Sequence, residues 1–267
     1  MKRENSLAPE SLEAQIRDLV SRLKDTPSSG PGHLLPLKKK PFQNRSLASR
    51  IDHTLLKPEA TLDQILAICA EARQYGFASV CVHSHWLPEV VKALRGSGAL
   101  PITVVGFPHG AQQPSAKAAE ARLAVKAGAR EIDMVVNLGR LKSHDWKSVA
   151  QDIQGVVRAA GKTPVKVIIE TALLTTEEKV IVAILCELSG AAYVKTSTGF
   201  SGGGATVEDV ALFRRLLGSR VKIKASGGIR TREFAEALLA AGANRLGTSN
   251  SVAIVNEETA TNQLGSY

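Results

Sequence analysis

The stretch Tyr193-Val194-Lys195-Thr196 and the segments that follow it decide the fold of this 267-residue chain. A short run of apolar and β-branched residues is typical of a buried strand. The Gly-rich segment 199–204, a helical pattern at residues 207–217 and a second strand-like run at residues 221–225 come next. Strand, helix and strand in this order predict a βαβ unit with two parallel strands.

The same alternation extends in both directions over most of the chain. We predict strands at residues 50–52, 79–83, 102–106, 131–137, 165–170, 193–196, 221–225 and 245–247. Helical patterns fall between them, at residues 62–75, 114–127, 145–160, 176–189, 207–217 and 231–241. Eight βα units in about 220 residues predict an α/β protein, a (β/α)8 TIM barrel with its catalytic groups at the carboxyl ends of the strands.

An open, doubly wound sheet is the alternative arrangement of such units. That fold binds a dinucleotide through a Gly-rich turn directly after its first strand. The first strand here has no such turn, whereas Gly-rich turns follow the sixth and seventh strands. The position of the glycines therefore favours the barrel.

The chain divides near residue 46 into an N-terminal extension, residues 1–45, and the barrel with a short C-terminal tail, residues 46–267. One apolar stripe of an amphipathic helix is formed by Leu12, Ile16, Leu19, Val20 and Leu23. Residues 24–41 have the composition of a linker or an ordered strap, rich in Pro, Ser and Gly. The extension either covers the barrel or a subunit interface, or is a loosely held arm.

Composition and charge argue against several classes of protein. No apolar stretch approaches the roughly 20 residues of a membrane span, and the N-terminus has no apolar signal segment, so we expect a cytoplasmic protein without membrane contact. Three widely spaced cysteines predict neither a disulfide framework nor a zinc site. The net charge is +9, but more than half of the excess lies in the first 50 residues. This distribution weakens the case for nucleic-acid binding, because the rest of the chain is only mildly basic. A small anionic ligand explains the remaining positive charge as well as a nucleic acid does.

Lys195 is the first candidate catalytic residue. Its amine is expected near the carboxyl end of a buried strand, where burial disfavours the ammonium form and lowers the pKa unless a carboxylate pairs with it. A neutral amine can attack a carbonyl carbon to form an imine. A solvated or ion-paired lysine at a strand end is the alternative, and the pattern taken alone also allows it.

Lys224 repeats this arrangement on the next strand. Period-two alternation places Lys222 and Lys224 on the same side, and Lys224 is nearer the carboxyl end of the strand. A second cation close to Lys195 would lower the pKa of the Lys195 amine. Two exposed lysines on a short strand are the alternative.

Asp133 places a carboxylate in an otherwise apolar strand. Buried acids need partners, and a lysine across a barrel is a suitable one. A carboxylate so placed can carry protons during imine formation and carbon–carbon bond cleavage. A structural ion pair is the alternative role.

Two Gly-rich turns follow the seventh and eighth strands. Ala225-Ser226-Gly227-Gly228-Ile229-Arg230 precedes a helix, and Leu246-Gly247-Thr248-Ser249 follows the last strand. Backbone N–H groups in such turns can approach an anion closely. This pair of positions is where a TIM barrel usually binds phosphate.

Seven motifs, in the same order along residues 46–252, resemble the deoxyribose-phosphate aldolase family. They are Ile51-Asp52-His53-Thr54-Leu55-Leu56-Lys57, Val80-Cys81-Val82, Val104-Val105-Gly106-Phe107-Pro108, Glu131-Ile132-Asp133-Met134-Val135, Lys166-Val167-Ile168-Ile169-Glu170-Thr171, Val194-Lys195-Thr196-Ser197-Thr198-Gly199-Phe200 and Lys224-Ala225-Ser226-Gly227-Gly228.

The resemblance implies a class I aldolase that reversibly cleaves 2-deoxy-D-ribose 5-phosphate to D-glyceraldehyde 3-phosphate and acetaldehyde. It implies a phosphorylated sugar as substrate, a homo-oligomer (dimer or tetramer), and neither a cofactor nor a metal. Lys195 would form the Schiff base, Lys224 would lower its pKa and exchange protons, and Asp133 would move protons through water.

The resemblance also assigns binding residues. Asp52 and Cys81 match positions that line the family's site. We expect Asp52 to orient Lys224, whereas Cys81 is better explained as a small buried apolar residue, since nothing in the chemistry needs a thiol. The family's phosphate-binding turns correspond to Gly199, Gly227, Gly228, Gly247 and Ser249.

Two other functions stay open at this point. One is an imine-forming barrel lyase that acts on a different phosphosugar. The other is a catalytically silent barrel that binds a sugar phosphate and uses its lysines only structurally. The presence of both lysines together with Asp133 argues against the silent barrel.

Overall fold

The computed structural model describes residues 47–256 and, in addition, Ala14, which is helical and exposed. The predicted apolar stripe of residues 12–23, the linker at 24–41 and the terminal tail otherwise lie outside the described residues. The division into an extension and a barrel therefore stays a prediction.

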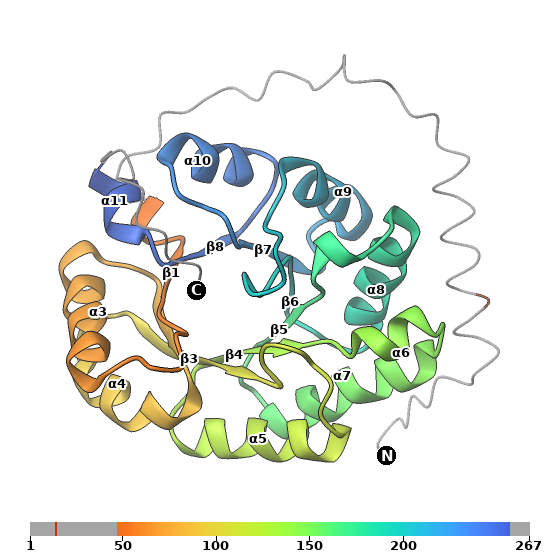
Figure 1. The fold of residues 1–267 in the computed structure, drawn as a ribbon, viewed down its shortest axis with the longest axis horizontal. Helices are drawn as coiled ribbons and strands as arrows, with labels where there is room; N and C mark the ends of the chain where they lie inside the picture. Colours follow the sequence, from red (N-terminus) through yellow and green to blue (C-terminus); the bar gives the residue numbers. More distant parts are fainter. Residues whose placement is uncertain (1–13, 15–46, 257–267) are drawn as a thin grey trace.

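Eight parallel strands close into a barrel in chain order, with β1 paired to both β2 and β8. The predicted (β/α)8 fold is thereby confirmed. Figure 1 shows the strands at the centre of the molecule. The strands are β1 (Ile51–Thr54), β2 (Ser79–Val82), β3 (Leu100–Val105), β4 (Glu131–Val135), β5 (Val165–Ile168), β6 (Tyr193–Lys195), β7 (Lys222–Ser226) and β8 (Arg245–Thr248).

Helices form a ring outside the strands (Figure 1). The longer ones follow the sequence prediction to within a residue at each end: α3 (Leu62–Tyr75), α5 (Pro114–Lys126), α7 (Trp146–Ala160), α8 (Thr176–Leu188), α9 (Val207–Leu217) and α10 (Arg232–Ala240). The prediction missed the short elements, which have less than two turns of periodicity: α4 (Leu87–Ala93), α6 (Leu138–Lys142), α11 (Ser251–Asn256) and the 3-10 turns η1 (Ser84–Trp86) and η2 (Thr171–Leu173).

Local chemistry fixes where these elements begin and end. The side chain of Thr61 accepts a hydrogen bond from the Gln64 N–H, and the Gln64 side chain accepts one from the Thr61 N–H, which starts α3. Gly76, at φ 72°, ends the same helix. The strand predicted at residues 131–137 is shorter than expected because Asn137 caps α6, its side chain accepting from the Arg140 N–H.

Two apolar layers lie on the two sides of the strands. Outward-facing residues such as Val80, Ile132 and Val194 pack against the helices in the main core. Inside the barrel, Leu56, Cys81, Ile102 and Val104 form a small separate cluster beside β2 and β3. The rest of the barrel interior, on the side of β1 and β4–β8, is lined by charged side chains. The charged side chains of the barrel interior therefore lie together on one side of it.

Within residues 47–256, no helix combines the length and the apolar character that crossing a membrane requires.

Candidate active site

A network of charged side chains from six strands fills one side of the barrel interior. Asp52 comes from β1, Glu131 and Asp133 from β4, Lys166 from β5, Lys195 from β6, Lys224 from β7 and Arg245 from β8. Period-two alternation turns each of them inward. Branched aliphatic residues usually fill this space in TIM barrels, so an interior with so much charge indicates a chemical role.

Asp133 lies at the centre of this network. Its Oδ2 accepts hydrogen bonds from Lys195 Nζ and from Lys224 Nζ, both at 2.8 Å. Its Oδ1 accepts one from Lys166 Nζ at 2.7 Å. All four side chains are almost completely buried. One carboxylate therefore serves three lysines, two of them through the same oxygen.

Asp52 and Glu131 hold the other cations. Asp52 lies 2.5 Å from Lys224 Nζ, and its other oxygen accepts from Arg245 and from the Ser79 hydroxyl, both at 2.6 Å. Glu131 contacts Lys166 at 2.7 Å and Arg245 at 3.3 Å. Asp52 thus contacts Lys224, the residue that we expected it to orient.

The charges of this network balance when Lys195 is neutral. The three carboxylates Asp52, Glu131 and Asp133 match the three cations Lys166, Lys224 and Arg245. A proton on Lys195 would add one uncompensated buried charge, which is costly in an interior of low dielectric constant.

The pKa directions agree with this balance. Burial, helped by the charge on Lys224, lowers the pKa of Lys195 even though Asp133 opposes the change. Burial also disfavours the charged form of Lys224, but Asp133 and Asp52 outweigh it and raise the pKa of Lys224. Burial acts to raise the pKa of Asp133, but Lys166, Lys195 and Lys224 together hold it well below its usual range. The site thus favours a free amine at Lys195 beside a charged Lys224.

Cys81 adjoins the network but belongs to the apolar cluster. Its side chain is fully buried with Leu56, Ile102 and Val104. Burial, followed by the negative charge of Asp133, raises the pKa of the Cys81 thiol to about 11. A neutral, buried thiol fits a small apolar wall residue rather than a nucleophile.

A cavity of about 290 Å³ opens at the carboxyl ends of β6, β7 and β8. Gly199, Gly228 and Ser249, which the sequence analysis assigned to phosphate binding, line it together with Arg230 and Thr248. The lining includes no carboxylate. Backbone N–H groups of glycine turns beside one guanidinium suit a phosphate group.

Gly227 and Gly247, two other predicted phosphate-binding residues, do not line this cavity. A Cβ on Gly227 would lie 2.9 Å from Gly204 Cα, and the Gly227 φ is +86°. A Cβ on Gly247 would lie 2.9 Å from Lys224 Cε and 3.0 Å from Ser226 Cβ. Gly227 permits close packing of two loops, and Gly247 leaves room for the Lys224 side chain.

The loop that follows β6 is tied to the end of β5 by Glu170. Its buried carboxylate accepts hydrogen bonds from the Thr198 N–H at 3.2 Å, from the Thr198 hydroxyl and from the Ser201 hydroxyl at 3.1 Å. Glu170 itself has a left-handed backbone, φ 56° and ψ 64°. A non-glycine residue in this conformation marks local strain, which proteins concentrate at functional sites.

Replacing Gly247 with alanine should displace Lys224. The new Cβ forces the Lys224 side chain away from Asp133 and Asp52, so we expect kcat to fall about 10- to 100-fold, as for ångström-scale shifts of catalytic groups. Gly155→Ala is the matched control, because nothing lies within 4 Å of the added Cβ. Steady-state kinetics of both variants measure the effect. Equal kcat values in the two variants would contradict this role of Gly247.

Several residues of the network were not assigned from the sequence. Lys166, Glu131 and Arg245 were missed, although Lys166 carries the same signal that singled out Lys195, a lone charge in an apolar parallel strand. Glu131 and Arg245 are first residues of their strands, where charged residues are common, and so they gave no distinct signal.

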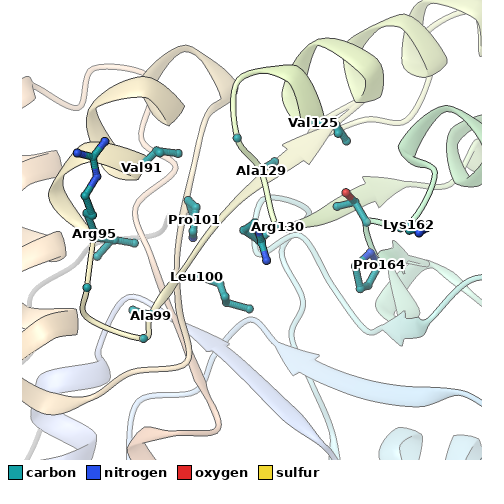
Figure 2. Close-up of a pocket in the computed structure, with 15 residues that line it drawn as sticks. Val91, Arg95, Ala99, Leu100, Pro101, Val125, Ala129, Arg130, Lys162 and Pro164 are labelled. Atoms are coloured by element: carbon teal, nitrogen blue, oxygen red, sulfur yellow. The ribbon is translucent and has the colours of Figure 1, made fainter.

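A larger cavity, of about 790 Å³, opens at the opposite end of the barrel (Figure 2). Its lining includes none of the charged residues of the network. The catalytic groups of TIM barrels lie at the carboxyl ends of the strands, so size alone does not make this cavity the active site.

Comparisons with known proteins agree with this site. A family model described as DeoC/LacD family aldolase matches residues 46–253. A deoxyribose-phosphate aldolase of Geobacillus sp. (strain WCH70) is 53% identical over 216 residues, which cover 80% of this chain and 97% of the relative. The one from Listeria monocytogenes serotype 4a (strain HCC23) is 52% identical over 214 residues, covering 80% and 96%.

Solved structures show the same relationship. A Coccidioides immitis protein, provisionally assigned as a deoxyribose-phosphate aldolase, has a TM-score of 0.85 and 41% identity, over 94% of this chain and 98% of that one. The tetrameric deoxyribose phosphate aldolase of Aeropyrum pernix has a TM-score of 0.75 and 32% identity, over 80% and 91%. The chain therefore belongs to the DeoC/LacD aldolase family, in which it groups with the deoxyribose-phosphate aldolases, enzymes of the lyase class.

Proposed function

We propose that this enzyme is a class I aldolase that reversibly cleaves 2-deoxy-D-ribose 5-phosphate to D-glyceraldehyde 3-phosphate and acetaldehyde. The observation that carries the proposal is the Lys195 amine, buried 2.8 Å from Asp133 in a network that is neutral only when Lys195 has lost its proton. Such an amine is a nucleophile at neutral pH.

The reaction begins with imine formation. The Lys195 amine attacks the C1 aldehyde of the open-chain sugar and forms a carbinolamine. Asp133, acting through a water molecule, moves one proton from the nitrogen to the carbinolamine oxygen. A second proton, from Lys224 or from solvent, then lets the hydroxyl leave as water. The product is a protonated Schiff base, whose positive charge Asp133 stabilises.

The carbon–carbon bond breaks next. Removal of the proton from the C3 hydroxyl turns C3 into the aldehyde carbon of glyceraldehyde 3-phosphate. The electron pair of the C2–C3 bond moves toward the iminium nitrogen and leaves an enamine on Lys195. Protonation of the enamine carbon and addition of water then release acetaldehyde and restore the free amine. Lys224, Asp133 and water exchange these protons in the proposed mechanism.

The phosphate group of the substrate would occupy the cavity lined by Gly199, Gly228, Arg230 and Ser249. This cavity follows the same strands as the two lysines, β6 and β7, and also β8. Phosphate binding there would hold the carbon chain in one direction across the barrel.

Reductive trapping tests the proposal directly. Borohydride added in the presence of acetaldehyde reduces the imine to a stable ethyl-lysine, which peptide mass mapping locates. We expect the ethyl group on Lys195 and on neither Lys166 nor Lys224, the two buried lysines that share Asp133 with it. An adduct on another lysine, or none in an active enzyme, would refute the assignment.

Arg230→Gln tests the phosphate cavity. Loss of a charge-assisted contact should lower kcat/KM for the phosphorylated sugar about 10- to 100-fold and leave that for free 2-deoxyribose nearly unchanged. Arg215→Gln, an exposed arginine of α9 that does not line the cavity, is the control. An equal loss of kcat/KM with both sugars would show that the phosphate group does not bind in this cavity.

We also propose that the enzyme works in the cytoplasm, in the degradation of deoxyribose phosphate, and as a homo-oligomer. The tetramer described for the relative from Aeropyrum pernix supports the assembly. Light scattering coupled to size-exclusion chromatography measures it, and a 28.4 kDa species would be the contrary result.

A further inference from the structure

The cavity at the amino-terminal end of the barrel has the features of a second ligand site. Its walls come from three successive loops, which join α4 to β3, α5 to β4 and α7 to β5. Its volume of about 790 Å³ falls within the range of small-molecule sites. This end of the barrel faces away from the catalytic loops.

Each of the three loops contributes one cation. They are Arg95, Arg130 and Lys162, and Figure 2 shows Arg130 between the other two. All three side chains are exposed. The residues that line the cavity include no aspartate and no glutamate. The cavity is therefore positively charged, without an acidic group of its own to neutralise it.

These three cations also have no partner elsewhere in residues 47–256, where none of their side chains takes part in an ion pair or a hydrogen bond. Glu131 follows Arg130 directly, but its carboxylate points into the barrel and binds Lys166 and Arg245. Like charges that surround one cavity repel each other, so an anion bound between them relieves repulsion and gains charge-assisted hydrogen bonds.

Much of the uncharged lining of the cavity is aliphatic. Leu94, Leu100, Pro101, Val125 and Pro164 contribute to it, and the lining contains no aromatic ring. A nucleobase would find no aromatic ring to stack on. A carbon skeleton with hydrogens on its faces fits such a lining better.

The spacing of the cations points to two anionic groups. Adjacent strands lie about 4.8 Å apart, so the loops that enter β3 and β5 are separated by about 10 Å. Two phosphates on a short carbon skeleton match this span with the outer side chains extended, whereas a single phosphate would have to draw both of them toward the centre. We propose that this cavity binds a small bisphosphate, with Arg95 and Lys162 at its two ends and Arg130 between them.

Titration with fructose 1,6-bisphosphate, followed by calorimetry and by amide NMR, tests the proposal. A phosphate ligand would also bind in the cavity of about 290 Å³ at the carboxyl ends of β6, β7 and β8. The experiment must therefore distinguish binding at that catalytic end from binding at the amino-terminal end. Gly96, Gly98 and Gly128 report on the proposed site, and Gly202 and Gly228 report on the catalytic one. We expect shifts in the first group, with affinity that falls as salt rises.

The double variant Arg95→Gln, Arg130→Gln should weaken this binding at least about tenfold, because two charge-assisted contacts are lost. Arg122→Gln, an exposed arginine of α5 outside the cavity, should bind as the unchanged protein does. Both variants should cleave the aldol substrate normally without bisphosphate, so this test stands apart from that of the proposed function.

Inorganic phosphate and pyrophosphate complete the experiment. Weaker binding of both than of the sugar bisphosphate supports a site built for two phosphates on a carbon skeleton. Three results would overturn the proposal: shifts confined to Gly202 and Gly228, undiminished affinity of the double variant, or inorganic phosphate binding as tightly as the bisphosphate.

Discussion

Lys195→Leu should lower kcat/KM for aldol cleavage by at least about 10⁴-fold, the scale on which loss of a catalytic nucleophile acts. The leucine fills the space of the lysine stem but cannot form an imine. Asp133 keeps Lys166 and Lys224 as partners, so the charge network loses no compensating cation. We therefore expect the fold to persist.

Two measurements check this expectation together. Steady-state kinetics gives the rate loss, and thermal unfolding followed by circular dichroism shows whether the variant is folded. Lys222→Leu is the matched control, an exposed lysine of β7 that should keep normal activity. A folded Lys195→Leu enzyme with more than about 1% of the original kcat/KM would exclude Lys195 as the nucleophile.

Lys224→Leu should shift the pH dependence of the reaction to higher pH. Lys224 lowers the pKa of Lys195 by adding a second positive charge beside it, after the larger effect of burial. Removing that charge stabilises the ammonium form of Lys195, so its pKa rises. Since a neighbouring charge moves a pKa by about 1–3 units, the free amine and the rate at neutral pH should fall about 10- to 1,000-fold.

The direction of the pH shift distinguishes a change in the pKa of Lys195 from general damage to the site. The alkaline shift predicts that the Lys224→Leu enzyme regains part of its rate as the pH rises, because Lys195 then loses its proton. The logarithm of kcat/KM against pH, measured for this variant and for Lys222→Leu, gives the profile. A rate that is low at every pH, with an unchanged midpoint, would assign Lys224 to proton transfer alone.

The fold could be predicted from the sequence because its signals are local. Short apolar runs between long helical patterns indicated all eight strands. The helix limits also depend on local chemistry, as the caps Thr61 and Gly76 of α3 show in the structure. Helices of five to seven residues were missed, since a turn or two of periodicity is too little signal. Strand β5 ends earlier than predicted because Glu170 adopts a left-handed backbone, which its sequence neighbours do not reveal.

The site could be predicted only in part, because its properties depend on pairings across the barrel. Lys195, Lys224 and Asp133 are charges in largely apolar strands and could be selected one by one. The bond from both lysines to one oxygen of Asp133 follows from barrel closure, which brings β4, β6 and β7 around a common centre. Gly247 was assigned to phosphate, but its contact with Lys224 is visible only in three dimensions.

The balance of charges inside the barrel limits which substitutions the chain can accept during evolution. A substitution that removes one carboxylate leaves a cation on another β-strand without its partner. A substitution that removes one cation likewise leaves a carboxylate unpaired. Single changes at these positions therefore carry a penalty of several kcal/mol, which a simultaneous change of the opposite partner avoids. Glu131 and Arg245, for example, should vary as a pair among descendants of this enzyme, because a change at either position alone leaves the charge of its partner unbalanced.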